Sequence, residues 1–231
     1  AMLVNFFFED SNLFHIFLRQ NLKCSIPLKT KDIAIMMDLD LDIFKIKHNN
    51  IAPSKGRILL SEPFSKDIYF KRSVVLLTEH NPHGSVGFIL NKPIDFNINK
   101  LIKDFPEFSA NVSIGGPVKT DSIHFVHVLG DLIPGSMHVM DDLYWGGDFD
   151  TLKELIVTGI IKPDQIRFFV GYSGWHPKQL DNEIGKDFWL VTKLTSQDIM
   201  DFSDNLWKQT LSKLGEKYKI WSNFPENPGM N

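Results

Sequence analysis

Glu183 and Gln179 are the residues of this sequence whose types and spacing best suit recognition of a polar ligand. Pro177 predicts the first residue of a helix, on which the carboxylate and the amide are four positions apart and share one face. Tyr172 and Trp175 precede this helix and offer amphipathic walls. The same group also suits a buried structural hydrogen-bond network, and we favour that alternative somewhat over a binding site.

Asn91 and His80 extend this hypothetical binding site. The segments VGFILN and RFFVGY predict apolar strands that end at a polar residue or at a glycine-rich turn. If the two strands are neighbours in the sheet, Asn91 lies next to the 171–175 loop, and the whole group lies on one side of the domain. The N-terminus of the following helix has unpaired N–H groups and a partial positive charge, which suit an anionic group or the carboxylate of a partner.

An enzymatic alternative uses Glu183 as the acid or base in a reaction on a small polar metabolite, with His80 nearby. A lone carboxylate without a metal motif, a nucleophile or a cofactor fingerprint provides too few groups for an active site, so we favour a non-enzymatic protein. GYSGW at 171–175 approaches the nucleophile elbow G-x-S-x-G, but Trp175 occupies the place of the second glycine. We therefore do not expect Ser173 to be an activated nucleophile.

The sequence predicts neither a metal site nor a cofactor. His124 and His127 are three residues apart on a predicted strand and so point to opposite faces, and Cys24 is the only cysteine. The dinucleotide fingerprint and the phosphate loop are both absent. Gly115 and Gly116 are candidates for an anion-binding nest of backbone N–H groups. No basic residue directly flanks them, and we favour a simple turn that requires positive φ.

The elements that must position these residues alternate between strand and helix signals from Gly56 to Trp221, with no repeat or linker. This organisation predicts one mixed α+β domain. Two β-branched and apolar runs around the turn HNPHG predict a hairpin. Helices are predicted at 97–108, from Asp150 to Gly159, from Pro177 onward and from Ser203 to Gly215.

Composition and charge exclude some classes of function. Lys and Arg number 25 against 28 Asp and Glu, for a formal net charge of -3, and there is no helix-turn-helix pattern or basic stripe. Direct DNA binding is therefore disfavoured, because Lys and Arg contacts to phosphate supply most non-specific affinity. No run approaches about 18 uncharged apolar residues, so no membrane span is predicted. A single cysteine favours a reducing compartment, the cytoplasm.

Three segments together resemble the bacterial AlgH/YqgE family. They are GRILLSEPFSKDIYFKRSVVLLTEHNPHGSVGFILNKP, IGGPV and FFVGYSGWHPKQLDNEIGKDFWL, and they span roughly Gly56 to Trp221. The resemblance implies an α+β fold in which antiparallel strands form a split pseudo-barrel with flanking helices. Two positions depart from the family pattern, because Ser173 stands where Ala is usual and Lys178 where Gly is common.

The resemblance also suggests how the chain is organised and what it does. Residues 1–36 form an N-terminal arm outside it, residues 37–222 one AlgH/YqgE-like domain and residues 223–231 a C-terminal tail; we expect natural translation to begin at Met36 or Met37. Family members are commonly labelled transcriptional regulators, without an established reaction. We therefore expect a cytoplasmic protein that regulates transcription indirectly, through an unidentified protein or small ligand, without contacting nucleic acid or membrane.

Overall fold

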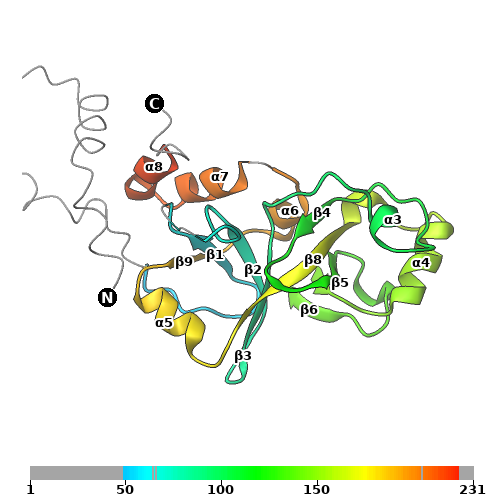
Figure 1. Cartoon of the computed structure of the whole chain (residues 1–231), viewed down its shortest axis with the longest axis horizontal. Helices are drawn as coiled ribbons and strands as arrows, with labels where there is room; N and C mark the ends of the chain where they lie inside the picture. The colour runs from blue at the N-terminus through cyan, green and yellow to red at the C-terminus, as the bar shows by residue number, and fades with distance from the viewer. Residues whose placement is uncertain (1–48, 64, 66, 204, 224–231) are drawn as a thin grey trace, which may run out of the picture. The chain divides into compact units, whose positions relative to one another are not determined.

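Apolar and β-branched runs of the sequence form one nine-stranded sheet in the part of the chain that the structure describes. The computed structural model describes residues 49–63, 65, 67–203 and 205–223. Neighbouring strands follow the order β6-β7-β5-β8-β3-β2-β1-β9, and β4 pairs with β8 (Figure 1). The strands are β1 (Ile58–Ser61), β2 (Val74–Asn81), β3 (Gly84–Ile89), β4 (Val112–Ile114), β5 (Val118–His127), β6 (Met137–Met140), β7 (Leu143–Trp145), β8 (Ile166–Trp175) and β9 (Trp189–Thr192).

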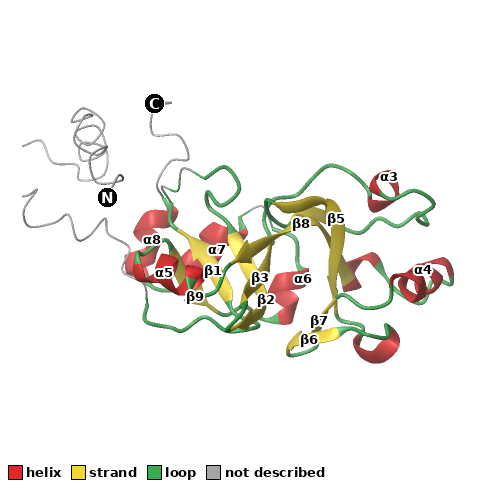
Figure 2. Ribbon diagram, turned by 60° about the horizontal axis from the view of Figure 1, so that its bottom comes forward, coloured by secondary structure: helices red, strands yellow, loops and turns green. Residues whose placement is uncertain are grey.

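The sheet is mainly antiparallel and open. Only β4 and β8 pair in parallel, and the end strands β6 and β9 do not pair with each other among the described residues. The predicted α+β class, with mainly antiparallel strands and flanking helices, is therefore confirmed, and the strands of the predicted split pseudo-barrel do not close into a barrel (Figure 2). The helices are α3 (Ile98–Leu101), α4 (Phe149–Val157), α5 (Gln179–Gly185), α6 (Ser196–Met200), α7 (Leu206–Lys213) and α8 (Glu216–Ser222), with 3-10 turns η1 (Gly130–Leu132) and η2 (Pro163–Gln165).

Strand β8 divides the sheet into two halves at Gly171. This glycine has a φ of +65°, and a Cβ there would lie 2.8 Å from the carbonyl oxygens of Gly116 and Val118. Before Gly171, β8 pairs with β4 and β5, whereas after it β8 pairs mainly with β3. We call β4 to β7 with α3 and α4 the β5 half, and β1 to β3 with β9 and α5 the β2 half.

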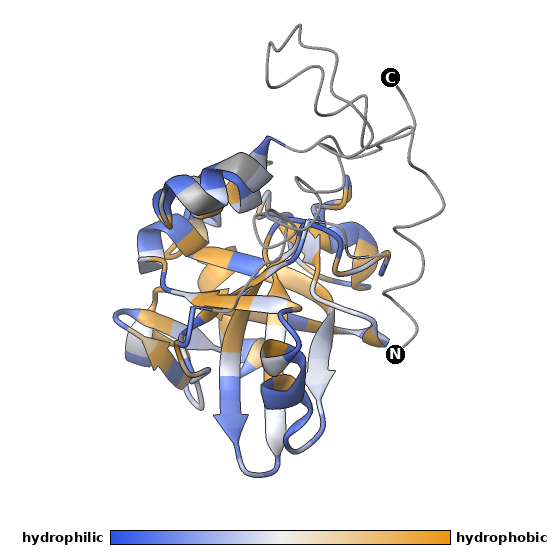
Figure 3. Ribbon diagram, turned by 90° about the vertical axis from the view of Figure 1, so that its left-hand side faces the viewer, coloured by the Kyte–Doolittle hydropathy of each residue, from blue (hydrophilic) through white to orange (hydrophobic). Residues whose placement is uncertain are grey.

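Each half has its own hydrophobic core. In the β5 half, Phe125 and Phe168 of adjacent strands pack with Leu152 of α4. In the β2 half, Leu77 and Trp189 belong to the cluster that α5 covers. Figure 3 shows the hydrophobic residues concentrated on the central strands. Because full burial of one such side chain contributes about 1.5–3 kcal/mol, each cluster stabilises its own half of the sheet.

A buried arginine links the two halves. Arg167 on β8 is 1% exposed, and its guanidinium donates to the carbonyl oxygens of Leu90, just after β3, and Ile199 on α6. It also packs over the rings of Phe169 and Phe202. Burial lowers the pKa of Arg167 to about 10, which leaves it charged at neutral pH. Carbonyl dipoles and aromatic faces therefore stabilise this buried charge.

The helix predicted at 97–108 is much shorter in the structure. Only Ile98–Leu101 is helical. Asp104 has a φ of +58°, and Pro106 disfavours helical backbone at Phe105. The prediction was wrong because the apolar spacing of the segment continues past these two helix-breaking positions.

Other helix ends also differ from the predictions. Helix α4 begins after Asp148 and not at Asp150, because the Asp148 side chain caps it. Helix α5 begins at Gln179 and not at Pro177, because Lys178 between them has a φ of +63°. Helix α7 begins after Asn205 and not at Ser203.

Two short helices, α6 and α8, were not predicted. The signal for α6 was present in the sequence, since Thr195 and Asp198 form a reciprocal capping box. The apolar stretch of α6 is too short to show a helical period, and this is why it was missed.

Several predictions concern residues outside the described part of the chain. These are the N-terminal arm at 1–36, the start expected at Met36 or Met37, Cys24 and the tail beyond residue 223. The described residues fall in one compact unit, Ile46–Ser222, except Asn223. Within the described ranges, no helix has the length and apolar character needed to cross a membrane.

Candidate functional site

The carboxylate of Glu183 is held by three hydrogen bonds within the β2 half. Its Oε2 accepts from the indole Nε1 of Trp175 at 2.9 Å and of Trp189 at 2.8 Å, and its Oε1 accepts from Nε2 of Gln179 at 2.9 Å. Both indoles are buried, and they pack edge to face with centroids 5.9 Å apart. Each carboxylate oxygen therefore already has a donor, and Glu183 ties α5 to β8 and β9.

The amide of Gln179 is occupied in the same way. Its Nε2 donates to Glu183, and its Oε1 accepts the backbone N–H of His176 at 3.0 Å. Helix α5, whose N-terminus was expected to attract an anionic group, is only seven residues long. The arrangement is that of a structural hydrogen-bond network, which was the alternative favoured for this pair.

Asn91 does not join this group. Strands β3 and β8 are antiparallel with Ser85 opposite Trp175, so the start of β3, and not its end, lies beside the end of β8. Asn91 is six residues beyond Ser85, about 20 Å further along the strand. There its side chain accepts from the N–H of Val74 and donates to the carbonyl of Arg72, both at 2.8 Å. The predicted placement of Asn91 is wrong because it assumed that the two strand ends meet.

Tyr172 and Trp175 point to opposite faces of the sheet. They are three residues apart on β8, which runs through to Trp175 where a loop was predicted. Trp175 belongs to the core of the β2 half, whereas the Tyr172 ring packs edge to face on the ring of His124, with the ring centroids 5.6 Å apart. The two rings do not face each other across one site, although both border a cleft of about 320 Å³ near the β2–β3 turn.

His80 is bonded within the same hairpin. It lies opposite Ser85, and its Nδ1 forms a 2.8 Å hydrogen bond with the Ser85 hydroxyl. Because Ser85 is opposite Trp175, His80 lies two strands, or about 10 Å, from Trp175. Among the described residues, His80 and Glu183 form no hydrogen-bonded acid–base pair, so the geometry gives no support to the enzymatic alternative.

Ser173, Gly115 and Gly116 allow two stretches of backbone to pack closely together. The buried Ser173 hydroxyl donates to the carbonyl of Gly115 at 2.9 Å. The N–H of Gly115 donates to Val170, so it is not available to an anion. A Cβ at Gly116 would lie 2.4 Å from the backbone of Tyr172. The glycines therefore allow β8 to approach, and the nest interpretation fails at Gly115.

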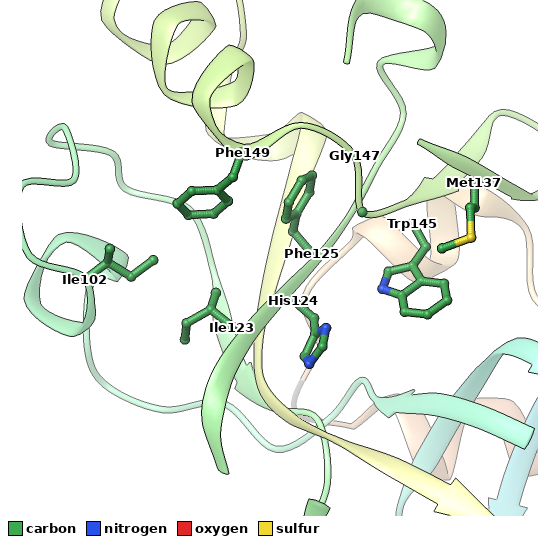
Figure 4. Close-up of a pocket in the computed structure, with 9 residues that line it drawn as sticks. Ile102, Ile123, His124, Phe125, Met137, Trp145, Gly147 and Phe149 are labelled. Carbon is green, nitrogen blue, oxygen red and sulfur yellow. The ribbon is translucent and has the colours of Figure 1, made fainter. Parts of the chain in front are cut away.

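An apolar cleft of about 440 Å³ opens in the β5 half, and none of the residues predicted for the binding site lines it. Figure 4 shows Phe149 and Ile102 on one side of β5, with Trp145 and Met137 on the other. The side chains of the residues that line it carry no carboxylate, amine, thiol or hydroxyl, and His124 provides the only imidazole. The lining residues are Ile102, Ile123, His124, Phe125, Met137, Trp145, Gly146, Gly147 and Phe149.

His124 is half-buried and uncharged at neutral pH. Burial lowers its pKa, and the charge of Lys119 lowers the pKa further. Its Nε2 lies 2.9 Å from the hydroxyl of Ser122, which itself donates to the Lys119 carbonyl at 2.7 Å. The ring proton therefore sits on Nε2 and is donated to Ser122. Since the Ser122 proton is directed away from His124, the pair is not arranged as a nucleophile and its base.

His127 lies on the same strand but is fully buried. Its Nδ1 accepts the N–H of Leu129 at 3.2 Å, so the ring proton is on Nε2, which is within 3.1 Å of Ser136 Oγ and the Gly146 carbonyl. Burial lowers the pKa of His127, although the hydrogen bond to Gly146 opposes this shift. Among the described residues, no group of three or more His, Cys, Asp or Glu side chains is placed to hold a metal ion.

The cleft was missed because its signals are weak in a linear sequence. Trp145 is followed at once by two glycines and a helix cap, and Met137 is 51% exposed on a short strand. Strand β7, which carries Trp145, was itself not predicted.

The fold and the cleft define a mixed α/β protein with a split, open antiparallel sheet and an apolar surface site. The AlgH-like family model matches residues 58–219 of this chain. The chain therefore belongs to the AlgH-like family, and the resemblance inferred from its three sequence segments is confirmed.

Relatives of this chain are bacterial proteins whose names assign no activity. A UPF0301 protein of Bacteroides thetaiotaomicron is 46% identical over 198 residues, which cover 84% of this chain and 100% of the relative. A UPF0301 protein of Parabacteroides distasonis is 44% identical over 193 residues, covering 82% and 98% of the two chains.

Two solved structures share the fold. The solution structure of the AlgH protein from Pseudomonas aeruginosa has a TM-score of 0.59 at 23% identity, covering 77% of this chain and 98% of that one. The crystal structure of protein DIP2367 from Corynebacterium diphtheriae has a TM-score of 0.61 at 22% identity, covering 75% and 94%.

Proposed function

We propose that this protein is a non-catalytic binding protein of the bacterial cytoplasm, which regulates transcription indirectly by contacting an apolar group of a partner through the β5-half cleft. The observation that carries the proposal is the chemistry of the cleft lining. Aromatic, aliphatic and thioether groups surround one uncharged imidazole, and the side chains there include no acid, amine or hydroxyl. Such a surface favours an apolar ligand, and apart from the His124 imidazole its side chains include no acid, base or nucleophile.

The energetics favour binding at this place. Met137 exposes 51% of its surface, and the partly buried Trp145 and Phe149 also line the cleft. Covering exposed apolar surface contributes about 25 cal/mol per Å² before the costs of association are subtracted, so an apolar partner group is favoured here over a polar one. Thioether and aromatic side chains also adapt their shape to different partners.

The group around Glu183 has a structural role and leaves ligand binding to the cleft. Its carboxylate and the Gln179 amide are bonded to each other and to backbone or indole groups, so they offer little to a ligand. A regulator that acts through the cleft uses this network only to hold the β2 half together.

The proposal is tested with the neutral apolar dye N-phenyl-1-naphthylamine, whose fluorescence rises when it leaves water. We expect saturable binding to the wild-type protein, weakened at least about tenfold by Met137→Asp, which places a charge in the cleft. The matched control is Val157→Asp, because Val157 at the end of α4 is 73% exposed and does not line the cleft. Absence of saturable binding, or equal effects of the two substitutions, would overturn the proposed function.

A further inference from the structure

The cleft lies at an uncovered edge of β5. The carbonyl of Phe125 accepts the N–H of Gly146 at 2.9 Å, so the backbone groups of Phe125 face the β7 side. Backbone groups two residues apart on a strand face the same edge, and those of Ile123 therefore also face this side. Strand β8 supports this orientation. Phe168, which pairs with Phe125, donates its N–H to the carbonyl of Asn111, on the side of β8 that faces away from β5.

No described strand continues the pairing on this edge of β5. The ladder with β7 contains only the pairs Val126–Trp145 and His127–Tyr144. After Trp145 the chain turns away through two glycines towards α4, and the Gly146 carbonyl is directed to Ser136 and His127. The N–H of Phe125 and both backbone groups of Ile123 are therefore left without a strand partner.

Two other edges of the described sheet, those of β9 and β4, are covered in part. On β9, the Asn49 side chain donates to the Val191 carbonyl at 2.6 Å and accepts the Val191 N–H at 3.3 Å, as a paired strand would. On β4, Ile94 donates to the carbonyl of Val112 at 3.0 Å. Sheets usually protect their edges in such ways, because an open edge invites another strand.

The shape of the cleft fits an added strand. Ile123, His124 and Phe125 are consecutive, and their side chains alternate between the two faces of the sheet. A cavity that all three line must therefore lie along the strand edge and not on one face. A strand placed about 4.8 Å from β5 would project successive side chains towards Phe149 and Ile102 on one face and towards Trp145 and Met137 on the other (Figure 4).

We infer that the cleft binds an extended peptide segment of a partner protein, which adds as a strand to the Ile123–Phe125 edge of β5. The inference rests on the proposed function and names its ligand. Two consecutive apolar residues of the peptide occupy the two walls of the cleft, and the peptide backbone pairs with Phe125 N–H and with Ile123. Backbone hydrogen bonds supply affinity in this mode, while the side-chain pockets supply specificity.

The inference is tested with heptapeptides selected from a random displayed library on the full-length protein. Each selected peptide is then made with single N-methyl groups along its backbone, which remove one N–H at a time. We expect an alternating pattern, with at least a tenfold loss of affinity at the N–H that pairs with Ile123 and little loss at its neighbours. Hydrogen exchange of the Phe125 amide is expected to slow when peptide is bound.

The outcomes separate this inference from the proposed function. If the dye binds the cleft but no peptide is selected, or if N-methylation has the same effect at every position, strand addition is overturned and apolar binding stands. If Met137→Asp weakens neither dye nor peptide relative to Val157→Asp, both fail. If sedimentation shows a dimer that Met137→Asp dissociates, the occupant is a second copy of this chain, and the assignment to a partner protein is overturned.

Discussion

In the β2 half, each carboxylate oxygen of Glu183 already has a donor, whereas in the β5 half Ile123 has no strand partner on its β7 side among the described residues. The first region is rich in polar side chains that satisfy one another. The second is poor in polar side chains but leaves apolar surface and backbone groups uncovered. Polar residues at promising spacing are thus not by themselves a site, because a binding surface needs groups that the fold has not already used.

The strongest test of this comparison is to break the Glu183 network. Glu183→Ala leaves two buried indole N–H groups without an acceptor. Because each unsatisfied donor costs about 1–3 kcal/mol, we expect the free energy of unfolding to fall by about 3 kcal/mol. Tm should fall by roughly 6–12 °C in a thermal melt.

Two variants control this prediction. Gln179→Ala removes one donor but leaves both indoles paired, so the expected loss is only about 1 kcal/mol. Asp181→Ala changes an exposed residue of the same helix and should be close to neutral. A Glu183→Ala protein that keeps its Tm but loses ligand binding would reverse the roles of the two halves.

The β5 half should make stability depend on pH. His127 and His124 both have pKa values lowered by burial, so between those values and about 6.5 the unfolded chain binds more protons than the folded one. Their contribution is fully present above about pH 6.5 and is lost as the pH falls through the folded pKa values. The slope is at most about 1.4 kcal/mol per pH unit for each histidine.

Urea unfolding between pH 5 and 8 measures this dependence. His127→Gln removes the buried titrating group, and the slope below pH 6.5 should become smaller even if the variant is less stable throughout. A slope identical to that of the wild-type protein would show that His127 keeps an ordinary pKa and that its buried, neutral environment has been misassigned.

A substitution near the bend in β8, where the two halves meet, should lower the free energy of unfolding by less. Ser173→Ala removes one buried hydrogen bond to the Gly115 carbonyl and creates almost no cavity. We expect a loss of about 1 kcal/mol or less in chemical denaturation. Dye and peptide binding should be unchanged, and a loss of binding would connect the bend to the cleft.

The smallest effect on stability is expected at the cleft itself. Met137→Ala alters a side chain that is half exposed, so the free energy of unfolding should change by no more than about 0.5 kcal/mol. Dye binding, in contrast, should weaken severalfold, because the side chain forms part of the cleft wall. A variant with unchanged stability and unchanged binding would remove Met137 from the site.

Much of the sheet was predictable from the sequence. The β-branched run at 74–77 and the turn after Asn81 form the expected hairpin, and the apolar run at 166–170 is the expected strand. These signals are local, because side-chain alternation and turn residues act over a few positions. Helix ends were less predictable. Lys178 adopts a backbone conformation that its residue type disfavours, and α3 ends at Leu101, where Ile102 becomes extended, although the apolar spacing continues.

The sequence by itself determined the family, the α+β class and the placement of Glu183 and Gln179 on one helix face, since motif order, periodicity and residue type are properties of the chain alone. Trp189, which also donates to Glu183, was not among the predicted site residues. Only the tertiary structure decided that Asn91 is absent from that network, because this depends on the direction in which β3 passes β8. The cleft likewise depends on where β7 stops beside β5, some twenty residues away along the chain. Pairing register and uncovered edges arise between distant segments, and no local pattern encodes them.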